Sequence, residues 1–267
     1  MKIIRLLLAA AAVFAFTGLG EFAAAAKKED KPSLPIPPSV KDLSQDNTYL
    51  NEEQELSDLQ PSELTKELLS TSKAKITNPR LIRMLNETSV NKSLFSIGMR
   101  ATVFLGEWPL SYSSDETSAN WEYQKVNTNF FDNRAGKSIY QMHYVQEAHK
   151  TVRGGLSVKL PRSEEVKQMV LKEAIQRTNL PLAYATSIGN GTKQNDIYNV
   201  APKTAGYLSA FAPAIHEKGR VAYGEVFLVL TGSKRALVIK NMTTKKVSAW
   251  IPISNHLSFS FRSVRQP

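Results

Sequence analysis

The stretch VAYGEVFLVL, residues 221–230, decides the fold class, because it is rich in the β-branched and aromatic residues that favour a pleated, half-buried surface. Short turns, such as the one at residues 231–234, separate it from further extended segments. These segments are RALVIKN (235–241), KVSAWIP (246–252) and HLSFSFRSV (256–264). Their length and spacing predict a meander of up to four antiparallel strands at the C-terminal end.

Another extended segment lies upstream, at IGMRATVFL, residues 97–105. Its apolar side chains recur with a period of two, which indicates a strand with one buried face. A loop is expected over residues 106–119. A hairpin is expected after it, with strands at 121–131 and 139–147 joined by the turn-forming residues 132–136.

Helices are predicted at three places. Pro61-Ser62-Glu63 begins a short one, and Asn78-Pro79 begins another, since Asn caps a helix and Pro suits its first turn. Ser163 begins a longer central helix, which has acidic residues in its first turn and ends before Pro181. The predicted class is α+β: a dominant antiparallel sheet with a C-terminal meander, one central helix and short N-terminal helices.

Residues 182–220 are rich in Gly, Asn, Ala and Pro and have only short apolar runs. This composition predicts one long loop or several. Long loops are uncommon in a compact domain unless they have a function.

The N-terminus has the layout of a signal peptide over residues 1–26. Lys2 and Arg5 precede an apolar stretch at 6–19, and small residues follow at 24–26. The alternative is an uncleaved membrane anchor, but the apolar stretch is shorter than the roughly 20 residues that a spanning helix needs. We therefore expect cleavage near Ala26 and a secreted or cell-envelope location.

The rest of the chain is expected to form a tether and one domain. Residues 27–60 are Pro-rich and charged, which predicts a disordered tether. Residues 61–267 are sufficient for a single α+β domain. The chain has no cysteine, so neither disulfides nor a lipid-modified cysteine holds it.

The charge of the chain suggests its partners. From Leu68 onward there are 27 Lys plus Arg and 13 Asp plus Glu, a balance of +14. Outside a cell this excess favours an anionic wall polymer, a membrane surface or an envelope protein as partner. The alternative is a solvated basic surface with no specific partner.

The sequence lacks the motifs that several common functions require. Residues 135–138 (AGKS) resemble the end of a phosphate-binding loop, but Phe131 stands where its first glycine is required, so no nucleotide is expected. Nucleic acid is not expected either. The four histidines show no metal-binding spacing, and no cofactor or metal is predicted. No G-x-S-x-G motif is present, and thiol hydrolases require a cysteine.

The leading hypothesis is a non-catalytic binding domain.

A candidate surface comes from NWEYQKVNTNFFDNRAG, residues 120–136, where aromatic residues stand among polar ones. In a strand Trp121, Tyr123 and Lys125 share a face. We expect Trp121 and Tyr123 to pack beneath the loop containing Trp108, with Lys125 and Arg134 reaching solvent at the end of a groove. The alternative is that these aromatic residues only pack against the sheet and bind nothing.

Two other functions stay open. A wall-directed hydrolase needs two acids beside aromatic residues, and the candidates for such a pair are Glu107, Asp115, Glu116 and Asp132. A scaffold or inhibitor of an envelope protein would bind through the loops expected at 182–220.

The chain also resembles a known family. The residues NPRLIRMLNETSVNKSLFSIGMRA (78–101), GEWPL (106–110) and NWEYQKVNTNFFDNRAG (120–136) are similar to the YfkD-like family of exported proteins from Bacillus and its relatives. The resemblance covers nearly the whole chain after the predicted tether. It implies export by a signal peptide, and it implies neither an activity nor any functional residue.

Overall fold

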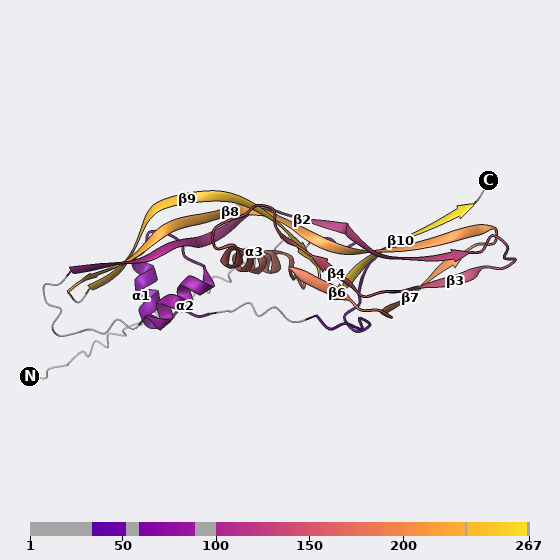
Figure 1. Cartoon of the computed structure of the whole chain (residues 1–267), viewed down its shortest axis with the longest axis horizontal. Coiled ribbons are helices and arrows are strands. Elements are labelled where there is room, and N and C mark those ends of the chain that lie inside the picture. Colours follow the sequence, from indigo (N-terminus) through magenta and orange to yellow (C-terminus); the bar gives the residue numbers. More distant parts are fainter. Residues whose placement is uncertain (1–33, 52–58, 89–99, 233, 266–267) are drawn as a thin grey trace, which may run out of the picture. The chain divides into compact units, whose positions relative to one another are not determined.

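The computed structural model describes residues 34–51, 59–88, 100–232 and 234–265. The chain divides into two compact units, Met1–Asp30 and Lys31–Pro267, and every described residue belongs to the second. The predicted signal peptide therefore lies outside the described residues. The elements in chain order (Figure 1) are β1 (Val40–Asp42), α1 (Glu63–Thr71), α2 (Pro79–Glu87), β2 (Arg100–Asp132), β3 (Tyr140–Val145), β4 (Lys150–Arg153), β5 (Gly155–Leu156), α3 (Ser163–Thr178), β6 (Ala185–Ile188), β7 (Lys193–Val200), β8 (Thr204–Thr231), β9 (Lys234–Pro252) and β10 (His256–Arg265).

Strand β8 is the centre of the main sheet (Figure 1). Strand β2 pairs antiparallel along one edge of β8, from Arg100 opposite Thr231 to Asp132 opposite Ala205. The other edge is shared, because β9 pairs with residues 214–231 of β8 and β10 pairs with residues 204–211. The α+β class with a dominant antiparallel sheet is confirmed.

The predicted meander is wrong in its connections. RALVIKN and KVSAWIP belong to one strand, β9, and β10 pairs with β8 and not with β9. The short connection after β9 explains this, since the Ile253 N–H donates to the Pro213 carbonyl at 3.0 Å. That bond keeps the chain on the same edge of β8, so β10 continues in the direction of β9.

The loop expected at 106–119 and the hairpin after it are also wrong, because β2 runs without a break through the expected loop and the first strand of the hairpin. Five register shifts interrupt the pairing of β2 with β8, the first beside Gly106 with φ of +106°. Each shift changes which residues face the core, so the period of two is lost in the sequence. Strand β3 pairs with β7 instead, and the Asn129 side-chain amide both donates to and accepts from the Val145 backbone.

The loops expected at 182–220 are in fact β6, β7 and the first half of β8. Small residues are required there because neighbouring segments of the chain approach one another closely. A Cβ on Gly206 would lie 2.5 Å from Cγ2 of Val200. Ala210, Ala212 and Ala214 are fully buried. A Gly- and Ala-rich composition therefore marks tight packing here and not a loop.

The predicted helix starts are confirmed. The Ser62 hydroxyl accepts from the Thr65 N–H at the start of α1, and the Asn78 side chain accepts from the Arg80 N–H at the start of α2. Helix α3 begins at Ser163 as expected. Among the described residues, no helix has both the length and the apolarity to cross a membrane.

Three hydrophobic clusters cover one face of the main sheet, which we call the inner face. One contains α3, a second contains residues of β3, β4, β6 and β7, and the third contains α1 and α2. Strand β8 contributes to all three clusters, through residues such as Ile215, Leu208 and Leu228. We call the opposite face of the main sheet the outer face.

The tether predicted over 27–60 is wrong for part of its described range. Val40–Asp42 form β1 and pair with β10. Leu43 is 1% exposed, and the buried Asn47 side chain donates to the Ser187 carbonyl and accepts from the Gly189 N–H. The folded domain therefore begins by residue 40, because these few side chains complete its core.

Candidate functional site

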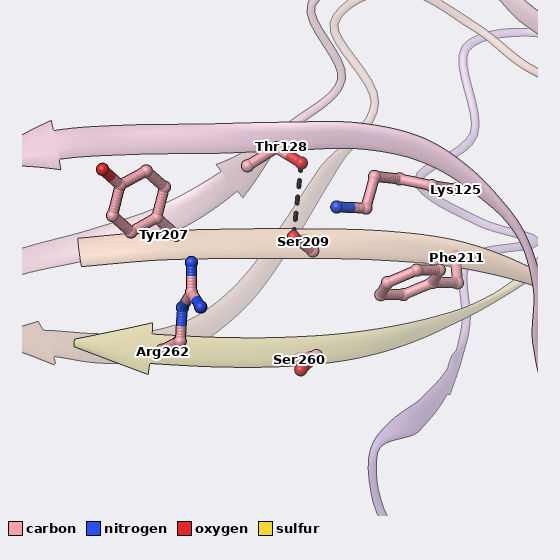
Figure 2. A pocket seen from close by; sticks show the side chains of 7 residues that line it. All are labelled: Lys125, Thr128, Tyr207, Ser209, Phe211, Ser260 and Arg262. Carbon is pink, nitrogen blue, oxygen red and sulfur yellow. Dashed lines mark hydrogen bonds between the residues drawn. The ribbon is translucent and has the colours of Figure 1, made fainter. Parts of the chain in front are cut away.

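A groove on the outer face is built from three cross-strand rows of the main sheet. The rows are Lys125–Phe211–Ser258, Thr128–Ser209–Ser260 and Phe130–Tyr207–Arg262, each with one residue from β2, β8 and β10. Residues paired across neighbouring strands point to the same face of the sheet. The groove has a volume of about 350 Å³ and is lined by Lys125, Thr128, Tyr207, Ser209, Phe211, Ser260 and Arg262 (Figure 2).

Two cations lie in this groove. The Lys125 ammonium is 5.4 Å from the centre of the Phe211 ring, and the Arg262 guanidinium is 5.5 Å from the centre of the Tyr207 ring. Such cation–π contacts position a cation without neutralising it. Within the described chain neither cation forms an ion pair, and the lining of the groove has no carboxylate. Both positive charges therefore remain available to an anionic ligand.

Hydroxyl groups lie between the two cations. Thr128 Oγ1 is 3.2 Å from Ser209 Oγ, and Ser260 lies beside them (Figure 2). A hydroxyl can donate one hydrogen bond and accept others. The row can therefore bind the oxygens of a polar ligand held between Lys125 and Arg262. The seven lining residues include no histidine and no carboxylic acid.

Of the predicted surface residues, Lys125 lies in the groove and Trp108 lies in the core. Trp108 is 6% exposed and packs in the cluster with α1 and α2. Its Nε1–H donates to the Leu105 carbonyl at 2.9 Å, and the Arg162 guanidinium stacks 3.7 Å from the ring centre. Trp108 is thus a structural anchor between the sheet and the start of α3.

The prediction that Trp121 and Tyr123 pack beneath the segment containing Trp108 is wrong. Trp121 packs against the cluster with α3, and Tyr123 packs against the cluster with β3 and β7. The reason is that β2 stays extended, so these residues reach successive clusters along the sheet instead of folding back on one another.

Arg134 also lies outside the groove lining. Its Nε–H donates to Asp132 at 2.8 Å, and its backbone N–H donates to the same carboxylate at 3.0 Å. These hydrogen bonds lower the pKa of Asp132 to about 2. Asp132 is therefore ionised at neutral pH and Arg134 already has a strong partner.

The other acids considered for a hydrolase form cross-strand contacts. Asp115 pairs with Arg220 at 2.8 Å and Glu116 pairs with Lys218 at 3.0 Å. Both acids line a second hollow of about 370 Å³ that also contains the cations Lys218 and Lys246. Glu107 is exposed at a different position of β2. The hydrolase alternative stays a prediction.

Comparison with known proteins identifies the chain. Residues 37–267 match the family model described as YfkD-like protein. The chain belongs to the YfkD-like family. It is 54% identical over 237 residues to the uncharacterized protein YfkD of Bacillus subtilis (strain 168), covering 89% of this chain and 88% of that relative. The resemblance inferred from the sequence is confirmed, and no solved structure matches the chain.

Sequence reasoning missed an aromatic stack that joins β2, β8 and β9 of this YfkD-like domain. The Trp250 ring stacks on His216 at 4.2 Å and on Tyr123 at 5.1 Å between ring centres. His216 and Trp250 are direct partners across β8 and β9. Burial, and then the charge of Lys218, lower the pKa of His216, so this imidazole is neutral at pH 7. The pairing depends on register, which the sequence does not reveal.

A buried carboxylate on the inner face was also missed. Glu217 is 0% exposed. Tyr112 Oη–H donates to its Oε1 at 3.0 Å, and Thr117 Oγ1–H donates to its Oε2 at 2.6 Å. Burial, followed by the Glu217 charge, raises the pKa of Tyr112 far above its usual range, so Tyr112 remains a hydrogen-bond donor. In this YfkD-like chain the side chains that donate to Glu217 are neutral hydroxyls. Among the described residues no cation pairs with it.

Proposed function

We propose that this YfkD-like protein is exported and binds an anionic cell-wall polymer through the outer-face groove without catalysing a reaction. The observation that carries the proposal is the pair of cations, Lys125 and Arg262, which lie at opposite ends of a hydroxyl row with no carboxylate in the lining. A polymer with repeated anionic and hydroxyl groups has the matching chemistry.

The charge of the chain supports the same proposal. The balance of +14 from Leu68 onward attracts a polyanion over longer distances and raises its local concentration. The two cation–π contacts reduce the side-chain freedom that binding would otherwise remove. The groove thus supplies specific contacts, and the excess charge supplies attraction.

Replacing both groove cations should weaken wall binding. We expect Lys125→Ala/Arg262→Ala to reduce the affinity for purified Bacillus cell walls by about tenfold or more, since two charge-assisted contacts are lost. Binding is measured by depletion of the protein from solution at increasing salt. Binding of the parent chain should fall steeply with salt, because exposed charges are screened over about 8–10 Å near physiological ionic strength.

The matched control is Lys150→Ala/Arg153→Ala, which removes the same charge from exposed positions on β4. This variant should retain most of the wall binding. Equal losses in the two variants would show a non-specific charge effect and refute a groove site. Full binding to walls stripped of their anionic polymer would refute the proposed ligand.

Export is tested separately. Fractionation of the native host should place a form that begins near Lys27 outside the membrane, because residues 1–26 have the layout of a signal peptide. N-terminal sequencing of that form checks the cleavage site. Full-length chain in the cytoplasm would contradict both the location and the wall ligand.

A further inference from the structure

A second feature of the outer face lies at the other end of β8, where β2, β8 and β9 run together beyond α1 (Figure 1). Phe104, Phe227 and Val238 form one cross-strand row, and Thr102, Val229 and Ala236 form the next row on the same face. Arg100, Thr231 and Lys234 form the last paired row. We call the six residues of the first two rows the apolar patch.

The β2 side of the apolar patch is open to solvent, and its β8 residues are half-buried. Phe104 is 57% exposed, and its ring lies 5.0 Å from that of Phe227. The Lys240 ammonium lies 4.9 Å from the centre of the Phe227 ring. Moving exposed aromatic surface out of water lowers the free energy of the system. The patch is therefore an exposed apolar surface that a partner could bury, and a cation lies directly beside it.

The cations beside the apolar patch that have no acid near them lie at one of its ends. The described residues 100–105, 226–232 and 234–240 contain Arg100, Lys234, Arg235 and Lys240 and no Asp or Glu. On the outer face Arg100 and Lys234 lie at one end of the patch and Lys240 lies at the other. Lys240 shares its row with two acids, Glu107 and Glu225, and Glu225 is its direct cross-strand partner. A partner that fits this surface has anionic groups at its surface and apolar groups beneath them.

We propose that the apolar patch binds face-on to an anionic lipid bilayer. The Phe104 and Phe227 rings enter the boundary between headgroups and acyl chains, while Arg100, Lys234 and Lys240 contact lipid phosphates.

The backbone of the patch is compatible with this contact. Each row is paired across β2, β8 and β9, so the face that meets the lipid presents side chains and not free backbone groups. Unpaired backbone groups are excluded from the hydrocarbon region by their cost. A sheet face therefore supports shallow binding, with the cations remaining at the headgroup level.

The apolar patch is separate from the groove. Tyr207 of the groove and Phe227 of the patch both lie on β8, and the 20 residues between these positions span roughly 65 Å at the usual rise of a strand. Variants at one site therefore leave the other intact. The lipid contact does not depend on the proposed polymer ligand.

The test is co-sedimentation with vesicles of phosphatidylglycerol and phosphatidylcholine, compared with vesicles of phosphatidylcholine alone. The protein begins at Lys27, so it contains the whole compact unit Lys31–Pro267 and lacks the apolar stretch at 6–19. We expect binding to the anionic vesicles only. Phe104→Thr should reduce that binding by about tenfold, since one exposed ring is lost from the contact.

Matched controls separate the patch from general effects. Ile197→Thr changes an exposed residue (53%) on β7 and should leave vesicle binding unchanged. Lys125→Ala/Arg262→Ala should also leave it unchanged. If Phe104→Thr lowers the melting temperature, Val229→Thr tests the same face. Equal binding by the parent and by a folded patch variant would overturn the proposal. So would binding to neutral vesicles alone, or a dimer that Phe104→Thr dissociates.

Discussion

Trp108→Ala is expected to lower the free energy of unfolding by about 3–5 kcal/mol, the usual cost of removing a large buried aromatic side chain. The indole is 6% exposed and fills the space between the sheet and the helices α1 and α2. Its loss also removes the Nε1–H bond to Leu105 and the stacking partner of Arg162. Urea denaturation of the parent and the variant measures the difference.

The control for Trp108→Ala is Ile139→Ala, at a residue that is 61% exposed. This variant should stay within about 0.5 kcal/mol of the parent, as surface substitutions usually do. Folded Trp108→Ala protein should still bind cell walls, because the residue lies outside the groove. A loss of stability below about 1 kcal/mol would contradict the anchoring role of Trp108.

Tyr112→Phe is expected to lower the free energy of unfolding by about 2–3 kcal/mol, the usual value of a hydrogen bond to a charged group. The variant deprives the fully buried Glu217 carboxylate of one of its two hydroxyl donors. The aromatic ring and its packing remain, so the measured loss reports on the hydroxyl. Equilibrium denaturation at neutral pH provides the measurement.

A double-mutant cycle identifies the cause of the Tyr112→Phe loss. In a Glu217→Gln background the bond from Tyr112 no longer reaches a charge, so Tyr112→Phe should cost only about 1 kcal/mol. Thr117→Val tests the second donor in the same way, since its hydroxyl lies 2.6 Å from Glu217 Oε2. Strictly additive losses would show that Tyr112 and Glu217 do not interact.

The sequence by itself determined the elements whose signals are local. Ser62 and Asn78 cap α1 and α2, and the acidic first turn places the start of α3, because helix ends depend on bonds within a few residues. The turn expected at 231–234 does separate β8 from β9. Apolar alternation predicted a strand at 97–105: residues 100–105 are the start of β2, where pairing is regular as far as Phe104, and residues 97–99 lie outside the described residues.

The sequence also supplied part of the groove. Lys125 was predicted to reach solvent from a strand, and it lines the groove. In HLSFSFRSV the alternation alone places Ser260 and Arg262 on the face opposite Leu257 and Phe259. It does not indicate that this strand lies beside Tyr207, since any antiparallel partner would give the same pattern.

Only the tertiary structure decided the course of β2 and β8 and the residues that meet across them. Register shifts hide the period of two in β2, and close packing makes β8 rich in Gly and Ala, so both read as loops. Lys125, Tyr207 and Arg262 meet because β8 pairs with β2 on one edge and with β10 on the other. The physical reason is that strand pairing joins residues far apart in the chain, through backbone bonds that every residue type can form.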